Sequence, residues 1–421
     1  MNTAKSLILL GLAASLMLPL QAQESDTQVL SLDDCITTAI QHNPLILGSL
    51  QQHQASLARI SQAKAFDQPS LNWDSDLQDR IFDFKNAGEW YFGISQQFEF
   101  PGKKSLKGKI AGKESEEILQ DIDLLKLDIT FQVKQAFYGL LLAQEKVKYV
   151  QQDLDLSQDF ISKAKVKFEA GDVARVEVLR AQVEVSKAQN ELRRAASDER
   201  LARAYLNYLM ARRKYEPLQI VGELRSKTVE LDLVELKNRA QSFRPEMKKI
   251  NFALEREGLQ RKSAQMSYLP DFELGVNRHK VTGEGQWWDF TLSFTIPLYF
   301  WQPSRGAIAE AQANITALYK EVEHIENTIS LEVEDAYLNA VATTNEIRLF
   351  EEEILTQAEE VYNMFLFSYQ EGEIGGIELI AARRTLIESR TTYADALFNH
   401  RAALAALEKS IGQPLEGDDH E

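Results

Sequence analysis

Residues 90–104 read WYFGISQQFEFPGKK, and the pattern of this stretch changes at Pro101. Before the proline, one face of the segment carries only apolar side chains apart from Gln96: Trp90, Phe92, Ile94, Phe98 and Phe100. The other face carries Tyr91, Gly93, Ser95, Gln97 and Glu99. Alternation over this length predicts a β-strand with one apolar face. Pro101 ends the strand, and no further proline occurs before Pro217.

The run 287–296 repeats this pattern and has an apolar face of Trp288, Phe290, Leu292, Phe294 and Ile296. A second alternating run precedes each of these strands, around residues 71–77 and 272–277. The stretches between the runs, at 86–88 and 282–285, contain glycine and polar residues, which are typical of hairpin loops. The sequence therefore predicts two β-hairpins, at about residues 70–100 and 270–297.

The prolines indicate that the chain is duplicated. Eight of the ten form pairs about 200 residues apart: Pro44 with Pro245, Pro69 with Pro270, Pro101 with Pro297, and Pro217 with Pro414. Because proline ends helices and central strands, prolines at matching positions in the two halves predict the same order of elements in each half. We expect a first repeat over 23–220 and a second over 221–421, each with a helix, a β-hairpin and a helical hairpin.

The remainder of each repeat is predicted to be a helical hairpin, at about residues 103–213 and 304–411. Apolar residues step by threes and fours in matching register, at Ile122, Leu125, Ile129 and Val133 and again at Val322, Ile325, Ile329 and Val333. An unbroken helix from Lys103 to Ala170 would be about 100 Å long at about 1.5 Å per residue. A helix of this length needs neighbours along it, so a coiled-coil-like assembly is expected.

Each helical stretch has one glycine-containing break. The first reads FEAGDVARVEVLRA over residues 168–181, and the second reads YQEGEIGGIELIAA over residues 369–382. Gly171 and Gly372 fit the left-handed position that closes a helix. The chain is expected to turn there and return as an antiparallel helix.

The N-terminus has the pattern of a secretory signal peptide, predicted over residues 1–22. Lys5 precedes an apolar run from Leu7 to Leu18, and a cleavage point fits after Ala22. This run falls short of the roughly 20 apolar residues that a membrane-spanning helix requires, and no later segment approaches that length. Any entry into a membrane would therefore be as β-strands. The lone Cys35 fits a half-buried helix cysteine.

Composition and motifs argue against nucleic-acid binding and catalysis. The formal net charge is −16, so no basic excess is present to neutralise phosphates. The six histidines lack ligand spacing, and no nucleophile elbow, phosphate-binding glycine loop or Cys-x-x-Cys occurs. We expect a protein that is not an enzyme and has no cofactor, no metal site and no nucleic-acid partner.

The strands fit either a soluble sheet with one face on a core or a membrane barrel. Strand lengths near ten residues and aromatic clusters at the strand ends favour the barrel, with Trp90, Trp288, Tyr299 and Trp301 as candidate membrane-interface residues. Four strands cannot close a barrel, because about eight is the smallest number known. Several chains must share one, and this arithmetic alone admits two chains.

The mature chain resembles the TolC-type outer-membrane efflux proteins. The resemblance rests on the duplicated layout, on the strand that ends Phe98-Glu99-Phe100-Pro101-Gly102-Lys103-Lys104, and on the tip pattern of an aromatic residue, glycine, and acid-hydrophobic-Leu-x-Ala. It implies a mainly helical homotrimer whose three chains give four strands each to a 12-stranded outer-membrane β-barrel. The barrel would continue into a long periplasmic helical barrel, whose tip docks on a periplasmic adaptor and an inner-membrane pump.

The resemblance also implies two kinds of site near the tips. The periplasmic gate of the family is an acidic constriction, which maps onto Glu378, with Glu371 and Glu373 nearby; the next position of that pattern is Ala381. Clustered carboxylates attract cations and raise one another's pKa. Alternatively, Glu378 is a solvated acid that complements the helix dipole. Adaptor docking is expected at the two turns, at Gly171, Asp172, Leu179, Gly372, Gly375, Gly376 and Leu379.

The Phe-Pro-Gly-Lys stretch is most similar to the CzcC and CusC branch, which serves heavy-metal pumps. The expected function is therefore a passive exit duct for metal cations, located in the outer membrane of a Gram-negative bacterium and served by a proton-driven pump. The alternatives are drug efflux, a type I protein-secretion duct, and a periplasmic coiled-coil scaffold without a pore.

Overall fold

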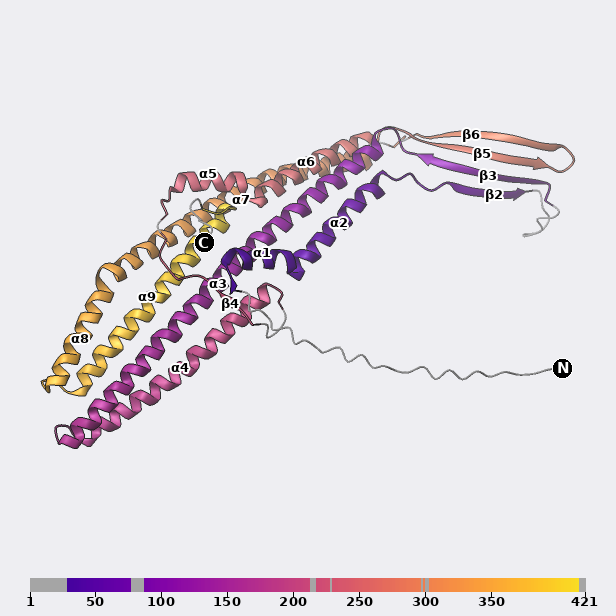
Figure 1. Cartoon of the computed structure of the whole chain (residues 1–421). Helices are drawn as coiled ribbons and strands as arrows, with labels where there is room; N and C mark the ends of the chain where they lie inside the picture. The colour runs from indigo at the N-terminus through magenta and orange to yellow at the C-terminus, as the bar shows by residue number, and fades with distance from the viewer. Residues whose placement is uncertain are drawn as a thin grey trace, which may run out of the picture.

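The computed structural model describes residues 29–76, 87–212, 217–227, 229–296, 298–299 and 303–415. The predicted signal peptide and Trp301 lie outside them. The molecule is long, with a four-stranded sheet at one end and helical hairpin tips at the other (Figure 1). Among the described helices, none combines the length and the apolar character needed to cross a membrane. The mainly helical class predicted from the sequence is confirmed.

Six elements precede the first tip, and one helix follows it. They are β1 (Val29–Leu30), α1 (Leu32–His42), α2 (Pro44–Lys64), β2 (Ser70–Asp76), β3 (Glu89–Phe98), α3 (Lys103–Ala170) and α4 (Arg175–Leu209). Ser31 and Asp34 form a capping box at α1, and Asn43 caps α2, which opens on Pro44. The unbroken helix predicted from Lys103 to Ala170 is confirmed, and its 68 residues give it a length of about 100 Å.

The second half contains β4 (Gln219–Ile220), α5 (Leu233–Phe243), α6 (Pro245–Met266), β5 (Asp271–Val281), β6 (Gly285–Thr295), α7 (Pro303–Leu349), the π-helical turn η1 (Phe350–Ile354), α8 (Leu355–Glu371) and α9 (Gly376–Ile411). The helical part therefore differs from that of the first half, because η1 separates α7 from α8. The chain changes direction there (Figure 1). One extra residue in a helical turn widens it and bends the helix, and the sequence pattern did not reveal this.

The four long strands form one antiparallel sheet in the order β2-β3-β5-β6. The predicted strands pair as β2 with β3 and β5 with β6, and the β3–β5 ladder joins the two pairs. Strands β2 and β6 are the edges of the sheet within one chain. The two short strands, β1 and β4, pair separately in parallel.

The two faces of the sheet differ as the alternation predicts. Aromatic and aliphatic side chains stand exposed on one face, among them Trp73, Phe92, Trp288 and Phe290. On the other face polar groups pack together, and Tyr91 stacks on His279 with 4.1 Å between ring centroids.

Gly93 shows how close that packing is. It lies opposite Asn277 in the register, and a Cβ at residue 93 would approach the Asn277 side-chain oxygen to 1.8 Å. The absence of a side chain at residue 93 makes room for the amide.

Two core clusters hold the helices together near the middle of the molecule. One joins α1, α3 and α4 around Leu140 and Leu206, and the other joins α5, α7 and α9 around Val333 and Leu407. Cys35 belongs to the first cluster and is fully buried rather than half-buried. Burial raises the pKa of its thiol to about 12, so the group is a neutral packing residue at neutral pH.

Candidate functional site at the helical tips

Each helical hairpin turns at a glycine in the left-handed conformation. Gly171 closes α3 with φ 87°, and Gly372 closes α8 with φ 81°. In both turns the next residue's N–H donates to the carbonyl five residues earlier at 2.9 Å. Only glycine adopts this conformation without strain, so both predicted turns are confirmed with their cause.

Tyr369 of α8 connects the tip of the second hairpin, α8 and α9, to the first hairpin, α3 and α4. Its hydroxyl donates a hydrogen bond to Glu177 Oε1 on α4 at 2.9 Å. Lys167 on α3 donates to the Tyr369 carbonyl at 2.6 Å, and its Nζ lies 4.7 Å from the tyrosine ring centroid. Burial and the bond to Glu177 raise the pKa of Tyr369, which therefore stays a donor at physiological pH. We call Tyr369, Glu177 and Lys167 the tip latch.

Gly376 allows the two hairpins to approach at the latch. A Cβ on this residue would lie 2.7 Å from the Phe160 ring and 2.9 Å from Glu177 Oε1. Phe160 in turn packs on Tyr369, with ring centroids 5.4 Å apart. Leu379 is buried in the same cluster and has only 4% of its surface exposed. Gly376 and Leu379 therefore belong to the contact between hairpins, and neither offers the exposed surface that adaptor docking would use.

A buried arginine makes a second connection between the hairpins. Arg383 on α9 is 5% exposed, donates to Glu184 on α4 at 3.1 Å and lies 3.4 Å from Asp153 on α3. It also donates a short hydrogen bond to the Ser157 hydroxyl. We call these four residues the Arg383 cluster. One cation thus holds two acids and a hydroxyl from both helices of the other hairpin, a geometry that suits a guanidinium.

The two carboxyls of the Arg383 cluster titrate differently. Burial raises the pKa of Asp153, and the nearby Arg383 offsets part of this. Burial also acts to raise the pKa of Glu184, but the hydrogen bond from Lys187 and the charges of Lys187, Arg383 and Arg384 lower it overall. Glu184 is therefore the firmly ionised partner of Arg383.

The predicted gate acids lie together in sequence at the second tip and are exposed. Glu371 ends α8, Glu373 lies in the turn, and Glu378 is in the first turn of α9. Ala381 follows Glu378 by three residues and is also exposed. Among the described residues, none forms a hydrogen bond or ion pair with Glu378, whereas Glu177, at the corresponding position of the first tip, accepts a hydrogen bond from Tyr369.

The remaining residues predicted for adaptor docking are exposed. Gly171, Asp172, Gly372 and Gly375 form the two turns, and Leu179 projects from α4 with 55% of its surface exposed. Val176 and Ile377, at equivalent places in the two tips, are exposed as well, so both tips present apolar side chains beside their turns.

Lys167 and Arg383 were not predicted as site residues, and Tyr369 was included only as the aromatic residue of the second tip pattern. A signal for Arg383 was present, because it stands between Leu379 and Leu386 at helical spacing and therefore on the buried stripe of α9. A charged residue at a core position needs a partner. Tyr369 and Lys167 gave no comparable signal, since their contact depends on how the two hairpins meet.

The aromatic residues predicted for the membrane interface lie at both ends of the sheet. Trp90 and Trp288 are near the end that is distant from the helices, and Tyr299 follows β6 at the end close to them. Trp288 and Tyr299 are exposed, and Trp90 is partly buried. Within the parts of the chain that the structure describes, no group of three or more histidine, cysteine or acidic side chains is placed to hold a metal ion.

The chain is similar to proteins of known class over most of its length. The model of the outer membrane efflux protein family matches residues 35–212 and 236–413. The cobalt-zinc-cadmium resistance protein CzcC of Cupriavidus metallidurans is 21% identical over 330 residues, which is 75% of each chain.

Solved structures share the fold. A structure of CusC superposes with a TM-score of 0.76 at 15% identity and covers 91% of this chain and 92% of its own. The open state of the MtrE outer membrane channel of Neisseria gonorrhoeae gives 0.75 at 16% identity, covering 93% and 91%. Because the family model accounts for both halves of the chain, this protein belongs to the outer membrane efflux protein family and resides in the outer membrane with a periplasmic extension.

Proposed function

We propose that the protein is the exit duct of a tripartite efflux system, formed by three copies that close a 12-stranded barrel above a helical tunnel. An inner-membrane pump, driven by protons, and a periplasmic adaptor would deliver the substrate. A passive conduit needs no catalytic group or cofactor. The observation that carries the proposal is the sheet itself, whose edge strands β2 and β6 have no partner on their outer sides among the described strands, and from which the helix α3, about 100 Å long, continues after β3.

The edges of the sheet support closure by further copies. Strands β2 and β6 present unpaired backbone groups, and in lipid such groups need partners. Because the four strands alternate in direction, β6 of one copy meets β2 of the next as another antiparallel pair. Repetition of this contact closes a ring, and the exposed aromatic face would then contact lipid.

The helices have edges that match those of the sheet. Helix α3 packs between α4 and α9, and α9 packs on α7 and α8, so α4 lies at one side and α7 with α8 at the other. Exposed apolar residues concentrate on these edge helices: Leu201, Tyr205 and Tyr208 on α4, Leu331 and Leu338 on α7, and Met364 and Phe367 on α8. Ring closure would bury these stripes against the neighbouring copy.

We infer that the tips act as the gate and the docking end. Three copies would bring three Glu378 side chains together, with Glu371 and Glu373 nearby, and a ring of carboxylates favours cations. The tip latch and the Arg383 cluster hold the second hairpin against the first, so the width of the opening depends on these contacts. The exposed turns around Gly171 and Gly372 are the surface available to an adaptor.

The substrate proposed is a heavy-metal cation, supported by the similarity to CzcC, a cobalt-zinc-cadmium resistance protein, and by the acidic tip. The test is the growth of a strain lacking this gene on cobalt, zinc, cadmium, copper and silver salts and on a panel of hydrophobic drugs, with a plasmid copy as the control. Sensitivity confined to metals, and restored by the plasmid, is the expected result. Sensitivity to drugs alone would refute the metal assignment and favour drug efflux.

A further inference from the structure

The exposed, mostly apolar face of the sheet becomes more polar toward the end that is distant from the helices. Register places the side chains in rows across the strands, and the inner rows on this face are apolar apart from Gln96, as in the row of Leu71, Ile94, Val276 and Phe290. The next row outward contains Trp73, Phe92, Arg278 and Trp288, and the last contains Ser75, Trp90, Lys280 and Gln286. Two cations therefore stand at the distant end of this face, in rows that also contain three tryptophans.

Arg278 and Lys280 lie in the outer part of the proposed lipid-facing band. Arg278 follows Phe272, in the innermost aromatic row, by six residues, which corresponds to about 20 Å at about 3.4 Å per residue. The apolar band of an outer-membrane barrel is about 25 Å tall. Barrel strands are tilted by about 35–45°, so Arg278 lies about 15 Å and Lys280 about 20 Å above Phe272 along the membrane normal. Both long side chains therefore lie in the outer part of the band, within reach of the lipid headgroups.

These two cations have aromatic neighbours and form no ion pair with a carboxylate of the described residues. The Arg278 guanidinium lies 4.9 Å from the Trp288 ring centroid, and Lys280 Nζ lies 5.9 Å from that of Trp90. The nearby acids Glu89 and Asp289 project from the opposite face, where they flank His279 at 3.8 and 3.7 Å.

The Arg278 guanidinium has N–H donors that the described residues do not use. Gln286 Oε1 accepts from its Nε at 3.1 Å and from one terminal nitrogen at 2.5 Å, which uses two of the five guanidinium N–H groups. The remaining donors and the Lys280 ammonium form a positive site on a chain with a net charge of −16. The chemistry complementary to this site is a phosphate.

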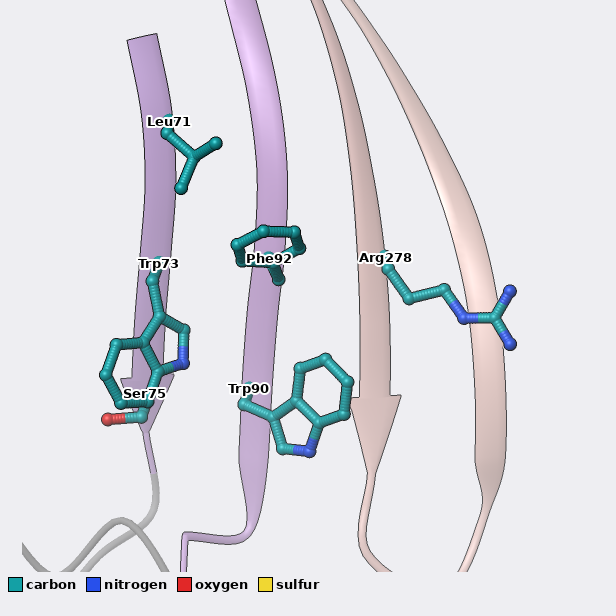
Figure 2. A pocket seen from close by; sticks show the side chains of 6 residues that line it. All are labelled: Leu71, Trp73, Ser75, Trp90, Phe92 and Arg278. Atoms are coloured by element: carbon teal, nitrogen blue, oxygen red, sulfur yellow. The ribbon is translucent and has the colours of Figure 1, made fainter.

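A groove of about 550 Å³ lies beside this positive site and is mostly apolar. Trp73 and Leu71 of β2 face Trp90 and Phe92 of β3, and the stem of Arg278 borders the groove (Figure 2). The guanidinium extends away from the two tryptophans, toward β6 (Figure 2). A ligand that filled both places would have an apolar chain directed inward and an anionic group at the outer boundary.

We propose that this face binds a phosphorylated lipid of the outer leaflet, with one acyl chain in the groove between Trp73 and Trp90 and a phosphate on Arg278 and Lys280. The inference rests on the proposed barrel, which places this face in lipid. Bound lipid would cover the groove beside edge strand β2, at the seam between copies, and would stabilise the closed ring.

The test uses the full-length protein, purified in mild detergent and examined by native mass spectrometry, with bis-phosphorylated lipid A as the probe. Wild-type protein is expected to retain lipid A. The Arg278→Gln, Lys280→Gln double variant should retain at least fivefold less, whereas Lys320→Gln, which alters an exposed lysine on α7, should match wild type. Trp73→Ala keeps both charges but removes one wall of the groove, so it should also lower the retention of lipid A. Arg278→Lys keeps a positive charge and should retain more lipid A than the double variant does.

Three results would overturn the lipid site: unchanged retention in the double variant, equal retention of lipid A without phosphates, or displacement of lipid A by inorganic phosphate alone. The same spectra report the mass of the assembly. A trimer that binds no lipid A would refute this inference and leave the proposed duct intact. A monomer that could be extracted from membranes without detergent would refute the proposed duct.

Discussion

The Tyr369 hydroxyl donates a 2.9 Å hydrogen bond to Glu177 and thereby ties the turn of one helical hairpin to the first turn of α4 in the other. The contact is charge-assisted, since Glu177 accepts as a carboxylate, and it is reinforced by Lys167 on the backbone of the same tyrosine. It is therefore a contact that must break if the second tip moves away from the first.

Replacing Tyr369 with phenylalanine should loosen the tip without removing the ring from its packing on Phe160. A hydrogen bond to a charged group contributes about 1.5–3 kcal/mol, and less when water competes, so about a five- to tenfold rise in the open fraction is expected. Single-channel recording in planar bilayers measures it. Tyr393→Phe is the matched control, because Tyr393 bonds Glu351 near the π-helical turn, and an equal rise there would refute a specific role for the latch.

Replacing Arg383 with alanine should lower the free energy of unfolding far more than replacing its neighbour Arg384. Arg383→Ala leaves Asp153 and Glu184 without their central cation, and breaking a buried pair from one side costs about 3–5 kcal/mol. Arg384→Ala removes a side chain that is 64% exposed, for which about 1 kcal/mol or less is expected. Thermal unfolding of both variants beside wild type measures the difference, and equal losses would show that the Arg383 cluster is not a structural centre.

The parts of this fold that could be predicted are those that local sequence specifies. Alternation from Trp288 to Phe294 identifies β6, and the glycines at 171 and 372 mark the ends of two helices, because each property follows from the backbone at that residue. The π-helical turn at Phe350 gave no such sign. The order of the strands in the sheet could not be predicted either. Alternation shows which side chains share a face of a strand, but not which strand pairs with it.

At the tips, the sequence identified the acids but not their partners. Glu177 and Glu378 occupy equivalent positions in the two copies of the motif, yet Glu177 is bonded across the hairpins and Glu378 is exposed. This difference depends on Tyr369, which is 192 residues from Glu177. Leu379 was predicted as a docking residue because it belongs to the tip pattern that the resemblance rests on, but the contact between hairpins buries it. Pairings of this range are set by the packing of whole helices.

Acidification should destabilise the region around His400 on α9. His400 Nε2 donates to the Lys227 carbonyl at 2.9 Å, and its Nδ1 lies 3.3 Å from the Thr343 hydroxyl. Burial lowers the pKa of His400, against the bond to Lys227, and the charge of Arg401 lowers it further. His400 therefore binds a proton near pH 6.5 in the unfolded chain but only at lower pH in the folded chain. Because protonation favours the unfolded chain, the stability contributed by His400 is lost as the pH falls below about 6.5.

The measurement for His400 is the unfolding temperature between pH 7.5 and 5. His400→Gln removes the titrating group, so its unfolding temperature should fall less over this range than that of wild type, even though the variant starts lower. His324→Gln, on the exposed surface of α7, should keep the wild-type slope. A variant at residue 400 that retained the full slope would contradict the assignment.

Glu378 is expected to set the cation preference of the channel, because three copies would place three carboxylates around one opening. A narrow ring of like charges attracts cations and repels anions. Glu378→Ala should therefore lower the cation-to-anion permeability ratio by about twofold or more, measured as the reversal potential across a salt gradient. The control is Glu169→Ala, which removes an exposed acid from the first tip and should leave the ratio unchanged. An unchanged ratio in Glu378→Ala would assign this residue to the helix dipole, which a single carboxylate in the first turn also stabilises.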